Sequence, residues 1–319
     1  MKTIITTSPF GHTNKAPLDY LIEYGVNFEL NRVGTKYSKE EHIQVLKDEQ
    51  PDVIIAGTEK YTAEILDLVP NLKMISRVGI GLDSVDLDEC RKRGIVVTYT
   101  PNAPSNAVAE LTVCQILNML RKVENVSGDM KQYTWNRYIG RELKNCKVGI
   151  IGYGRIGKLL YKKLSAFGCS LYVNDIDHQA IAELPQFWCN KSKEWMLKNC
   201  DVISIHIPLK DDKFDNHDYI NLTDLDMMKD NVRLLNLSRG GIINERDLYT
   251  WLQERPKATV AIDTFDKEPY REQLANMGNA YLTPHLGSCT VQSRRDMELG
   301  AAIEAVNFIT SQPYNHRVV

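Results

Sequence analysis

The chain has 319 residues, a length typical of about two domains that each bury a core of their own. Its 39 basic and 41 acidic residues give a formal net charge of -2, so the balance does not favour a nucleic acid or another polyanion as partner. No stretch approaches the roughly 18 consecutive apolar residues of a membrane span, and the first residues lack the pattern of a signal peptide. We therefore expect a cytoplasmic protein with a small-molecule partner, no membrane and no nucleic acid.

The cysteines are scattered along the chain and include no CxxC pair. This distribution argues against a disulfide framework and against a zinc site. We expect reduced thiols and no bound metal.

Short β-rich runs alternate with helical patterns over the first hundred residues. The runs expected to form strands are 2–7, 26–31, 52–57, 73–78 and 95–99. Helical patterns lie between them at 17–25, 38–49 and 62–70. Strands joined by helices of this length need crossover connections, so the order predicts a mainly parallel sheet with helices on its faces.

A second series of strands follows a long helix expected over 105–125. Its near-continuous apolar runs are 147–152, 170–175, 201–207, 233–238, 259–264 and 280–284. Such runs are typical of strands covered on both faces. A last helix is expected over 291–312. The fold class predicted is α/β, with two doubly wound parallel-sheet domains and a cleft between them.

A glycine-rich motif opens the helical pattern after the strand 147–152. It reads Gly152-Tyr153-Gly154-Arg155-Ile156-Gly157. Gly152 suits a tight turn, Gly154 lets the backbone approach a pyrophosphate at the positive end of a helix, and Gly157 lets helix and strand pack closely. Because of this setting, we expect a dinucleotide there, with Arg155 and Ile156 also contacting it.

An acidic residue, Asp175, ends the next strand. A carboxylate at this place hydrogen-bonds the hydroxyls of an adenosine ribose and repels a 2′-phosphate, with Asp177 adding to the repulsion. The pattern favours NAD over NADP. FAD or S-adenosylmethionine as the ligand stays open on this motif alone.

Polar residues follow three further strands of the second domain. Arg239 comes after the strand 233–238, Asp263 and Glu268 after the next, and His285 after the last. Ligands of open parallel sheets bind beyond the carboxyl ends of the strands. A cation, a carboxylate and an imidazole are therefore expected at one edge of this sheet.

The chain resembles the D-isomer-specific 2-hydroxyacid dehydrogenases, most closely the phosphoglycerate dehydrogenase and hydroxypyruvate/glyoxylate reductase group. The resemblance covers nearly the whole chain. It rests on RVGIGLDSVDL, VAEL, GIIGYGRIGK, LNLSRGGIIN, DTFDKEP and TPHLGS, which occur in the family's order and at its spacing.

This resemblance implies an NAD-dependent enzyme with Arg239, Glu268 and His285 as catalytic residues. It also implies a substrate-binding domain over 1–101 and 287–319 and an NAD-binding Rossmann domain over 102–286. The substrate loop falls on Arg77 to Asp83. Further cofactor contacts are expected at His206, Pro208, Asp263 and Gly287.

The chemistry of the reaction suits these residue types. Hydride addition to the carbonyl carbon of a 2-keto acid builds negative charge on the oxygen, which needs a proton and a nearby cation. Arg239 offers a permanently charged fork, and His285 can hold and release a proton near neutral pH. Glu268 against the other ring nitrogen would fix the tautomer. Reduction and oxidation should therefore have different pH optima.

On the substrate side, the N–H groups of Val78 and Gly79, with that of Ile80, are expected to form a nest for the substrate carboxylate. Arg77 either receives a phosphate or another anionic group of the substrate, or pairs with Asp83 or Asp86 as part of the scaffold.

Trp135 resembles a family position on an arm that crosses to a second subunit, and a core tryptophan is the alternative. The family's pattern implies a homodimer.

The chain departs from the family's pattern in the loop PLKDDKFDNHD at 208–218, which lacks two threonines often found there. The short segment after the last helix implies no C-terminal regulatory domain. His12, His42, His178 and His316 are expected at the surface, and His217 in that charged loop is expected to have no fixed partner.

Other functions remain open at this point. Formate and phosphite enzymes share the scaffold, but Glu268 argues against formate, whose hydride leaves without a proton relay. A dinucleotide-sensing binding protein, like the corepressors that reuse this fold, keeps the same triad. The specific acid is not defined by the sequence.

Overall fold

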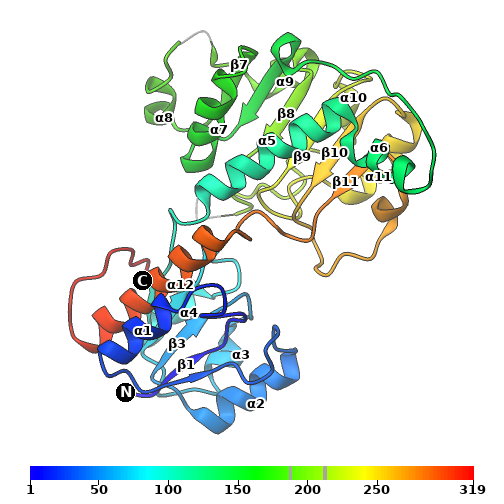
Figure 1. Cartoon of the computed structure of the whole chain (residues 1–319). Helices are drawn as coiled ribbons and strands as arrows, with labels where there is room; N and C mark the ends of the chain where they lie inside the picture. The colour runs from blue at the N-terminus through cyan, green and yellow to red at the C-terminus, as the bar shows by residue number, and fades with distance from the viewer. Residues whose placement is uncertain (187–188, 211–213) are drawn as a thin grey trace. The chain divides into compact units, whose positions relative to one another are not determined.

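The computed structural model describes residues 1–186, 189–210 and 214–319 (Figure 1). The chain forms two compact units. Unit 1 consists of Met1–Pro104 and Ser288–Val319, and unit 2 consists of Ser105–Gly287. Each is built on a parallel sheet with helices on its faces, so the predicted α/β class with two parallel-sheet domains is confirmed.

Unit 1 contains a five-stranded sheet in the order β2-β1-β3-β4-β5. The strands are β1 Thr3–Ile5, β2 Phe28–Leu30, β3 Val53–Ala56, β4 Met74–Arg77 and β5 Val96–Thr98. Its helices are α1 Ala16–Glu23, α2 Lys39–Glu49, α3 Ala63–Leu66, α4 Leu87–Arg93 and α12 Val291–Ile309. All four strand pairs are parallel and lie at the positions that the apolar runs predicted.

Two apolar clusters cover the faces of this sheet. On one face α12 contributes Met297, Ala301 and Ala305, and it packs beside α1 against β3 and β4. The other face is covered by Leu46 of α2 and Ile65 of α3, together with residues of α4. The small alanine side chains let α12 approach the sheet closely.

Unit 2 contains a six-stranded sheet in the order β11-β10-β9-β8-β6-β7. The strands are β6 Lys147–Ile151, β7 Ser170–Asn174, β8 Val202–Ile205, β9 Arg233–Asn236, β10 Thr259–Ile262 and β11 Ala280–Leu282. The helices are α5 Ser105–Arg121, α6 Val123–Lys131, α7 Arg155–Ser165, α8 His178–Ala182, α9 Lys193–Asn199, α10 Leu222–Asp226 and α11 Glu245–Glu254, with short 3-10 helices η1 Leu143–Asn145 and η3 Gln273–Asn276. In Figure 1, α5 lies across one face of this sheet.

The sheet of unit 2 is buried on both faces. Ile116 and Met119 of α5 and Leu160 of α7 belong to the cluster on one face. Leu248 and Trp251 of α11 belong to the cluster on the other. The adjacency of β9, β10 and β11 brings the three loops that follow them to one edge of the sheet.

The prediction of one long helix over 105–125 is wrong about where this helix ends. Lys122 adopts a left-handed conformation with φ of 54°, so α5 stops at Arg121 and α6 begins at Val123. The side chain of Asn118 accepts a hydrogen bond from the N–H of Glu124 at 2.9 Å. This N–H lies in the first turn of α6 and has no partner within the helix, so Asn118 supplies one. The chain thereby changes direction before the segment that carries Trp135.

In the described ranges, no helix is long and apolar enough to cross a membrane. The same residues contain no group of three or more His, Cys, Asp and Glu side chains placed to hold a metal ion.

His42 was expected at the surface, and this prediction is wrong. It lies in α2 one turn before Leu46, is 4% exposed and packs edge-on against the ring of Tyr61. Burial lowers the pKa of His42 from 6.5 to about 4. Its ring therefore stays neutral in the folded chain under conditions that protonate it in the unfolded chain.

This difference predicts an acid-sensitive fold. Between pH 6.5 and about 4 the unfolded chain binds a proton at His42 that the folded chain does not, so stability falls as pH falls through this window. The shift in the pKa of His42 corresponds to roughly 3 kcal/mol of unfolding free energy lost across this window. Replacing His42 by Phe keeps a ring against Tyr61 and removes the proton, so H42F should lose less stability than the wild type between neutral pH and pH 4 in urea titrations. The exposed His12 serves as control, and equal losses in wild type, H12F and H42F would contradict the prediction.

Candidate active site

The glycine-rich turn after β6 is shaped by close backbone contacts. Gly152 has φ of +96°, and a Cβ there would lie 2.4 Å from the carbonyl oxygen of His206. A Cβ on Gly157 would lie 2.0 Å from the carbonyl oxygen of Gly152. Nothing lies within 4 Å of a Cβ built on Gly154, the residue before the first turn of α7. Two glycines are thus required by packing, whereas Gly154 leaves open space at the helix N-terminus.

Asp175 lies beside this turn, directly after β7. Its carboxylate accepts a hydrogen bond from the N–H of Tyr153 at 2.5 Å and another from the N–H of Asp177 at 2.8 Å. Asp177 in turn caps α8 by accepting from the N–H of Gln179. The carboxylate is therefore held next to the glycine-rich turn, where it could meet the adenosine ribose of a dinucleotide whose pyrophosphate would lie at the start of α7.

The loops after β9 and β10 are packed backbone against backbone. A Cβ on Gly240 would lie 2.1 Å from the carbonyl group of Phe265. A Cβ on Gly241, which has φ of +77°, would lie 2.7 Å from a carboxylate oxygen of Asp266. These two glycines allow the loop of Arg239 and the loop of Glu268 to touch.

Arg239 follows β9 in a loop organised by Asn236. The amide of Asn236 donates to the carbonyl oxygen of Arg239 at 2.7 Å, and its oxygen accepts from the N–H and the hydroxyl of Ser238 at 3.1 and 2.7 Å. The guanidinium of Arg239 donates to the carbonyl oxygen of Ser238 at 2.8 Å. The half-buried cation is thereby tied to the carboxyl edge of the sheet.

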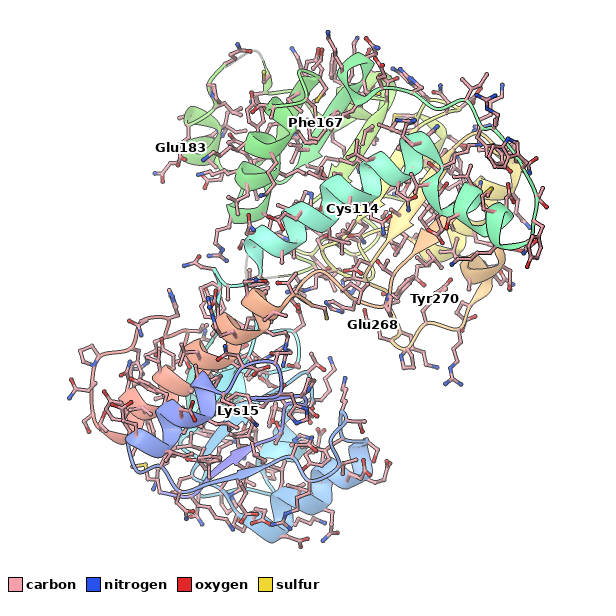
Figure 2. All side chains as sticks on the ribbon, viewed as in Figure 1. Lys15, Cys114, Phe167, Glu183, Glu268 and Tyr270 are labelled. Atoms are coloured by element: carbon pink, nitrogen blue, oxygen red, sulfur yellow. The ribbon has the colours of Figure 1, made fainter. Side chains whose placement is uncertain are left out.

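His285 and Glu268 form an ion-pair contact. The Nδ1 atom of His285 lies 3.0 Å from Oε2 and 3.1 Å from Oε1 of Glu268. Figure 2 labels Glu268 on the loop after β10, near Tyr270. The Glu268 carboxylate also accepts from the N–H of Phe265 at 3.2 Å. With Nδ1 facing the carboxylate, Nε2 is the ring nitrogen on the other side of the imidazole.

Asp263 has a role that the sequence did not reveal. The side chain is 1% exposed, and it accepts hydrogen bonds from the hydroxyl of Thr283 at 2.6 Å and from the N–H groups of Leu286 and Gly287 at 2.7 and 2.8 Å. The N–H of His285 donates to the carbonyl oxygen of Asp263 at 3.0 Å. Burial raises the pKa of Asp263. Asp263 therefore holds the loop on both sides of His285.

These hydrogen bonds to Asp263 matter because the backbone of His285 is in an unusual conformation. Its φ of 54° lies in the left-handed region, which a residue with a side chain occupies at a cost. The bonds to Asp263 on either side keep it there. Sequence analysis offered one signal for this, an acidic residue at the end of the neighbouring strand.

The substrate loop after β4 differs from the prediction. The N–H of Val78 donates to the carbonyl oxygen of Ala56 at 2.9 Å, and the N–H of Gly79 donates to the hydroxyl of Thr100 at 2.8 Å. The expectation that these two groups form an open nest is wrong for this conformation, because both donors are already used inside unit 1. Arg77 is 7% exposed, and its guanidinium donates to the carbonyl oxygen of Val78.

Two further histidines lie near this edge of unit 2. Nε2 of His206 lies 2.8 Å from the hydroxyl of Ser204, and burial lowers the pKa of His206 to about 4. His217 was expected to have no fixed partner, which is wrong, because its Nδ1 lies 2.6 Å from a carboxylate oxygen of Asp215. The carbonyl oxygen of Pro208 accepts from the amide of Asn216 at 2.8 Å. Residues 211–213 of the predicted charged loop lie outside the described residues.

The glycine contacts give a stability test of this arrangement. Gly240→Ala should lower the free energy of unfolding by about 3 kcal/mol or more, because the new methyl group overlaps backbone atoms of Phe265 that cannot rotate away. Gly154→Ala adds the same atom in open space and should change stability by about 0.5 kcal/mol or less. Urea denaturation of both variants measures this, and equal losses would show that the two loops are not packed as described.

Comparisons with known proteins agree on one family. A family model described as D-isomer specific 2-hydroxyacid dehydrogenase, NAD binding domain, matches residues 113–287. The chain is 34% identical over 275 residues to a glyoxylate reductase of Thermofilum pendens, covering 83% of this chain and 80% of that protein. It is 30% identical over 276 residues to a hydroxypyruvate reductase of Thermotoga maritima, covering 85% and 88%. An NAD+-bound crystal structure of 3-phosphoglycerate dehydrogenase from Entamoeba histolytica superimposes with a TM-score of 0.82 at 26% identity, covering 100% of this chain and 98% of that one.

Proposed function

Because the chain belongs to the D-isomer-specific 2-hydroxyacid dehydrogenase family and is an NAD-dependent oxidoreductase, we propose that it interconverts a small 2-keto acid and its D-2-hydroxy acid. Glyoxylate and hydroxypyruvate are the proposed substrates, after the names of two similar proteins. The observation that carries this proposal is the contact of His285 with Glu268 at the carboxyl edge of the sheet that also holds the glycine-rich turn.

The residues of unit 2 fit NAD. The open space beside Gly154 would admit a pyrophosphate at the N-terminus of α7, and Asp175, held beside this turn, is proposed to meet the ribose hydroxyls. Arg155, Ile156, Pro208, Gly287 and the neutral ring of His206 are proposed to line the same site. When bound, the nicotinamide supplies or accepts the hydride.

The protein's side chains stabilise the negative charge that develops on the substrate and transfer one proton. Arg239 presents a fixed positive charge to the substrate carboxylate and to the oxygen on which negative charge develops. His285 donates a proton from Nε2 in reduction and takes one back in oxidation. Glu268 holds the ring in the tautomer that this exchange needs and stabilises its protonated form.

Asp263 acts through the loop that it binds. Three of its hydrogen bonds keep residues 283–287 in place, so we assign it mainly to positioning His285, with a carboxamide contact to the cofactor as its proposed second role.

Unit 1, which consists of Met1–Pro104 and Ser288–Val319, is proposed to bind the rest of the substrate; the sequence predicted this domain over residues 1–101 and 287–319. Among the described residues, no hydrogen bond from the N–H of Ile80 is found, so this group is the donor proposed to meet the substrate carboxylate. Val78 and Gly79 would take part only by exchanging their present bonds. The burial of Arg77 favours a role in supporting this loop, which agrees with substrates that lack a phosphate.

The proton role of His285 can be tested against a matched histidine. His285→Ala should lower kcat for glyoxylate reduction by about 10²- to 10⁴-fold and leave the NADH dissociation constant nearly unchanged, because the ring serves the proton transfer. His217 is a similarly exposed histidine with its own carboxylate partner, so His217→Ala should keep the wild-type rate. A His285→Ala enzyme with wild-type kcat would refute the assignment.

Glu268→Gln should lower kcat and change the pH profile of the rate.

The protein is also proposed to form a homodimer through α6 and the segment that follows it. Trp135 is 77% exposed, so the alternative of a core tryptophan is wrong. Tyr133 and Ile139 are 100% and 98% exposed, and Val123 and Met130 of α6 are also exposed. An apolar patch of this kind on one continuous segment fits a second copy of the chain.

Light scattering on variants of this patch tests the dimer. Trp135→Ser combined with Ile139→Ser should convert a dimer to a monomer, because the substitutions remove apolar side chains that the second copy would bury. Ile176→Ser, which changes an exposed apolar residue elsewhere on unit 2, should leave the dimer intact. A wild-type monomer, or dissociation of the control, would contradict the proposal.

The cytoplasm is proposed as the compartment. Cys90, Cys146 and Cys200 are buried, and burial raises the pKa of all three thiols. Such thiols are unreactive and suit a reducing environment.

A further inference from the structure

A cavity lies at the amino edge of the six-stranded sheet, opposite the carboxyl edge that carries His285. It has a volume of about 430 Å³ and is lined by residues at the starts of β10 and β11, on α6 and at the end of α11. This volume falls in the range of small-molecule sites, roughly 300 to 1,000 Å³. All lining residues belong to unit 2, so the cavity is complete within that unit.

The charge of the lining is entirely positive. Lys122 and Lys257 both line the cavity, and no lining residue is acidic. The ammonium group of Lys122 lies 5.0 Å from the centre of the Tyr138 ring, which also lines the cavity. Glu124 acts electrostatically on the lining residue Tyr281, and its carboxylate accepts from the amide of Asn118 at 3.4 Å. The charged residues that line the cavity are therefore both lysines.

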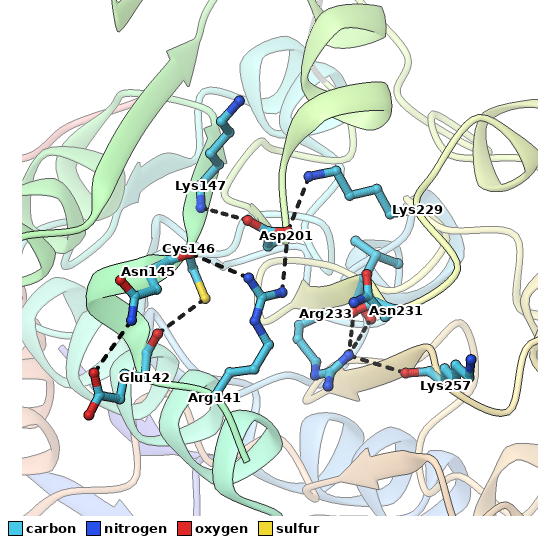
Figure 3. A network of polar contacts seen from close by, with 11 residues as sticks. Arg141, Glu142, Asn145, Cys146, Lys147, Asp201, Lys229, Asn231, Arg233 and Lys257 are labelled. Atoms are coloured by element: carbon cyan, nitrogen blue, oxygen red, sulfur yellow. Dashed lines mark hydrogen bonds and ion pairs between the residues drawn. The ribbon is translucent and has the colours of Figure 1, made fainter. Parts of the chain in front are cut away.

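A buried arginine adds to this positive charge. Arg233 starts β9, is 9% exposed and pairs across the strands with Thr259, which lines the cavity. Its guanidinium donates to the carbonyl oxygens of Asn231 at 2.5 Å and of Lys257 at 3.2 Å, as Figure 3 shows. The Nε atom of Arg233 is buried without a partner. A buried cation bonded only to carbonyl groups raises the electrostatic potential around it.

The carboxylate of Asp201, which also acts on Arg233, is paired with other groups. Asp201 is contacted by Lys229 at 3.1 Å and by Arg141 at 3.3 Å, and it also accepts from the N–H of Lys147 at 2.8 Å (Figure 3). Burial, and after it the neighbouring Arg141, lower the pKa of Arg233. Arg141, Lys229 and Arg233 all interact with the single carboxylate of Asp201, so an anion in the cavity would offset part of their charge.

The rest of the wall suits an organic group. Leu252, Pro256 and Met277 supply apolar surface, and Asn125 and Gln253 supply amides. A bare inorganic ion would leave this apolar surface in contact with water. The wall therefore fits a ligand with an anionic end and a small organic body.

We propose that this cavity binds a phosphate ester of a small organic molecule, with Lys122 and Lys257 contacting the phosphate and the buried Arg233, opposite Thr259 on the adjacent strand, adding positive charge. Ammonium groups are common phosphate ligands because they act as compact point charges with several donors. The site is distinct from the carboxyl edge, so its ligand acts apart from the dehydrogenase reaction. Asn125, whose side chain contacts Tyr281 and the carbonyl oxygen of Gly278, belongs to the cavity wall, whereas Val123 and Met130 of the same helix are exposed apolar residues.

Calorimetric titration of the whole protein tests this proposal. The probes are glycerol 3-phosphate, inorganic phosphate and, as an uncharged control, glycerol, at constant ionic strength and with NAD+ saturating so that its own phosphate site is filled. We expect saturable binding of one glycerol 3-phosphate per chain and no binding of glycerol. Lys122→Gln combined with Lys257→Gln should weaken this binding by about tenfold or more. Weaker binding of inorganic phosphate with the same lysine dependence would support the site.

A charge-matched control separates the cavity from general electrostatics. Lys144→Gln combined with Lys162→Gln removes two exposed lysines of unit 2 outside the cavity and should leave affinity within about twofold of the wild type. Keto-acid reduction by both double variants should keep its wild-type rate. Absence of saturable binding, equal loss of affinity in the two double variants, or competition of glycerol 3-phosphate with the keto acid would each overturn the proposal.

Discussion

The candidate active site depends on the buried carboxylate of Asp263. It binds the hydroxyl of Thr283 and the N–H groups of Leu286 and Gly287, and in doing so it fixes the loop in which His285 adopts a positive φ. These bonds stabilise a backbone conformation that is unfavourable for a residue with a side chain. Burial of the carboxylate is offset by its hydrogen bonds, and the result is an imidazole whose Nδ1 faces Glu268.

The parallel sheet of unit 2 supplies the second constraint. Because β9, β10 and β11 are neighbours, the loops of Arg239, Glu268 and His285 leave the sheet at the same edge. The small size of Gly240 then allows two of these loops to pack backbone to backbone. The same topology separates the two ends of the strands, so the cationic cavity at the amino edge lies apart from this chemistry.

The sequence predicted the parts of the structure that local patterns determine. The strands follow the apolar runs, and the pairing of His285 with Glu268 agrees with the motif. Prediction from the sequence failed where a tertiary contact determines the local conformation or the hydrogen-bond partner. The break at Lys122 needs a residue in the left-handed conformation, and no glycine in the sequence marks this position. The sequence also did not show that the N–H of Val78 is used in the sheet pairing of unit 1. The burial of His42 was available from the pattern, because it lies one turn from the buried Leu46.

The most direct test of the central claim is a crystal structure with NADH and oxamate, an unreactive analogue of a 2-keto acid. The account predicts Nε2 of His285 within hydrogen-bonding distance of the oxamate oxygen that stands in for the keto group, with Nδ1 still on Glu268 and the Arg239 fork on the same ligand. A ligand bound elsewhere, or a His285 ring turned away from it with Glu268 paired to another residue, would contradict the account.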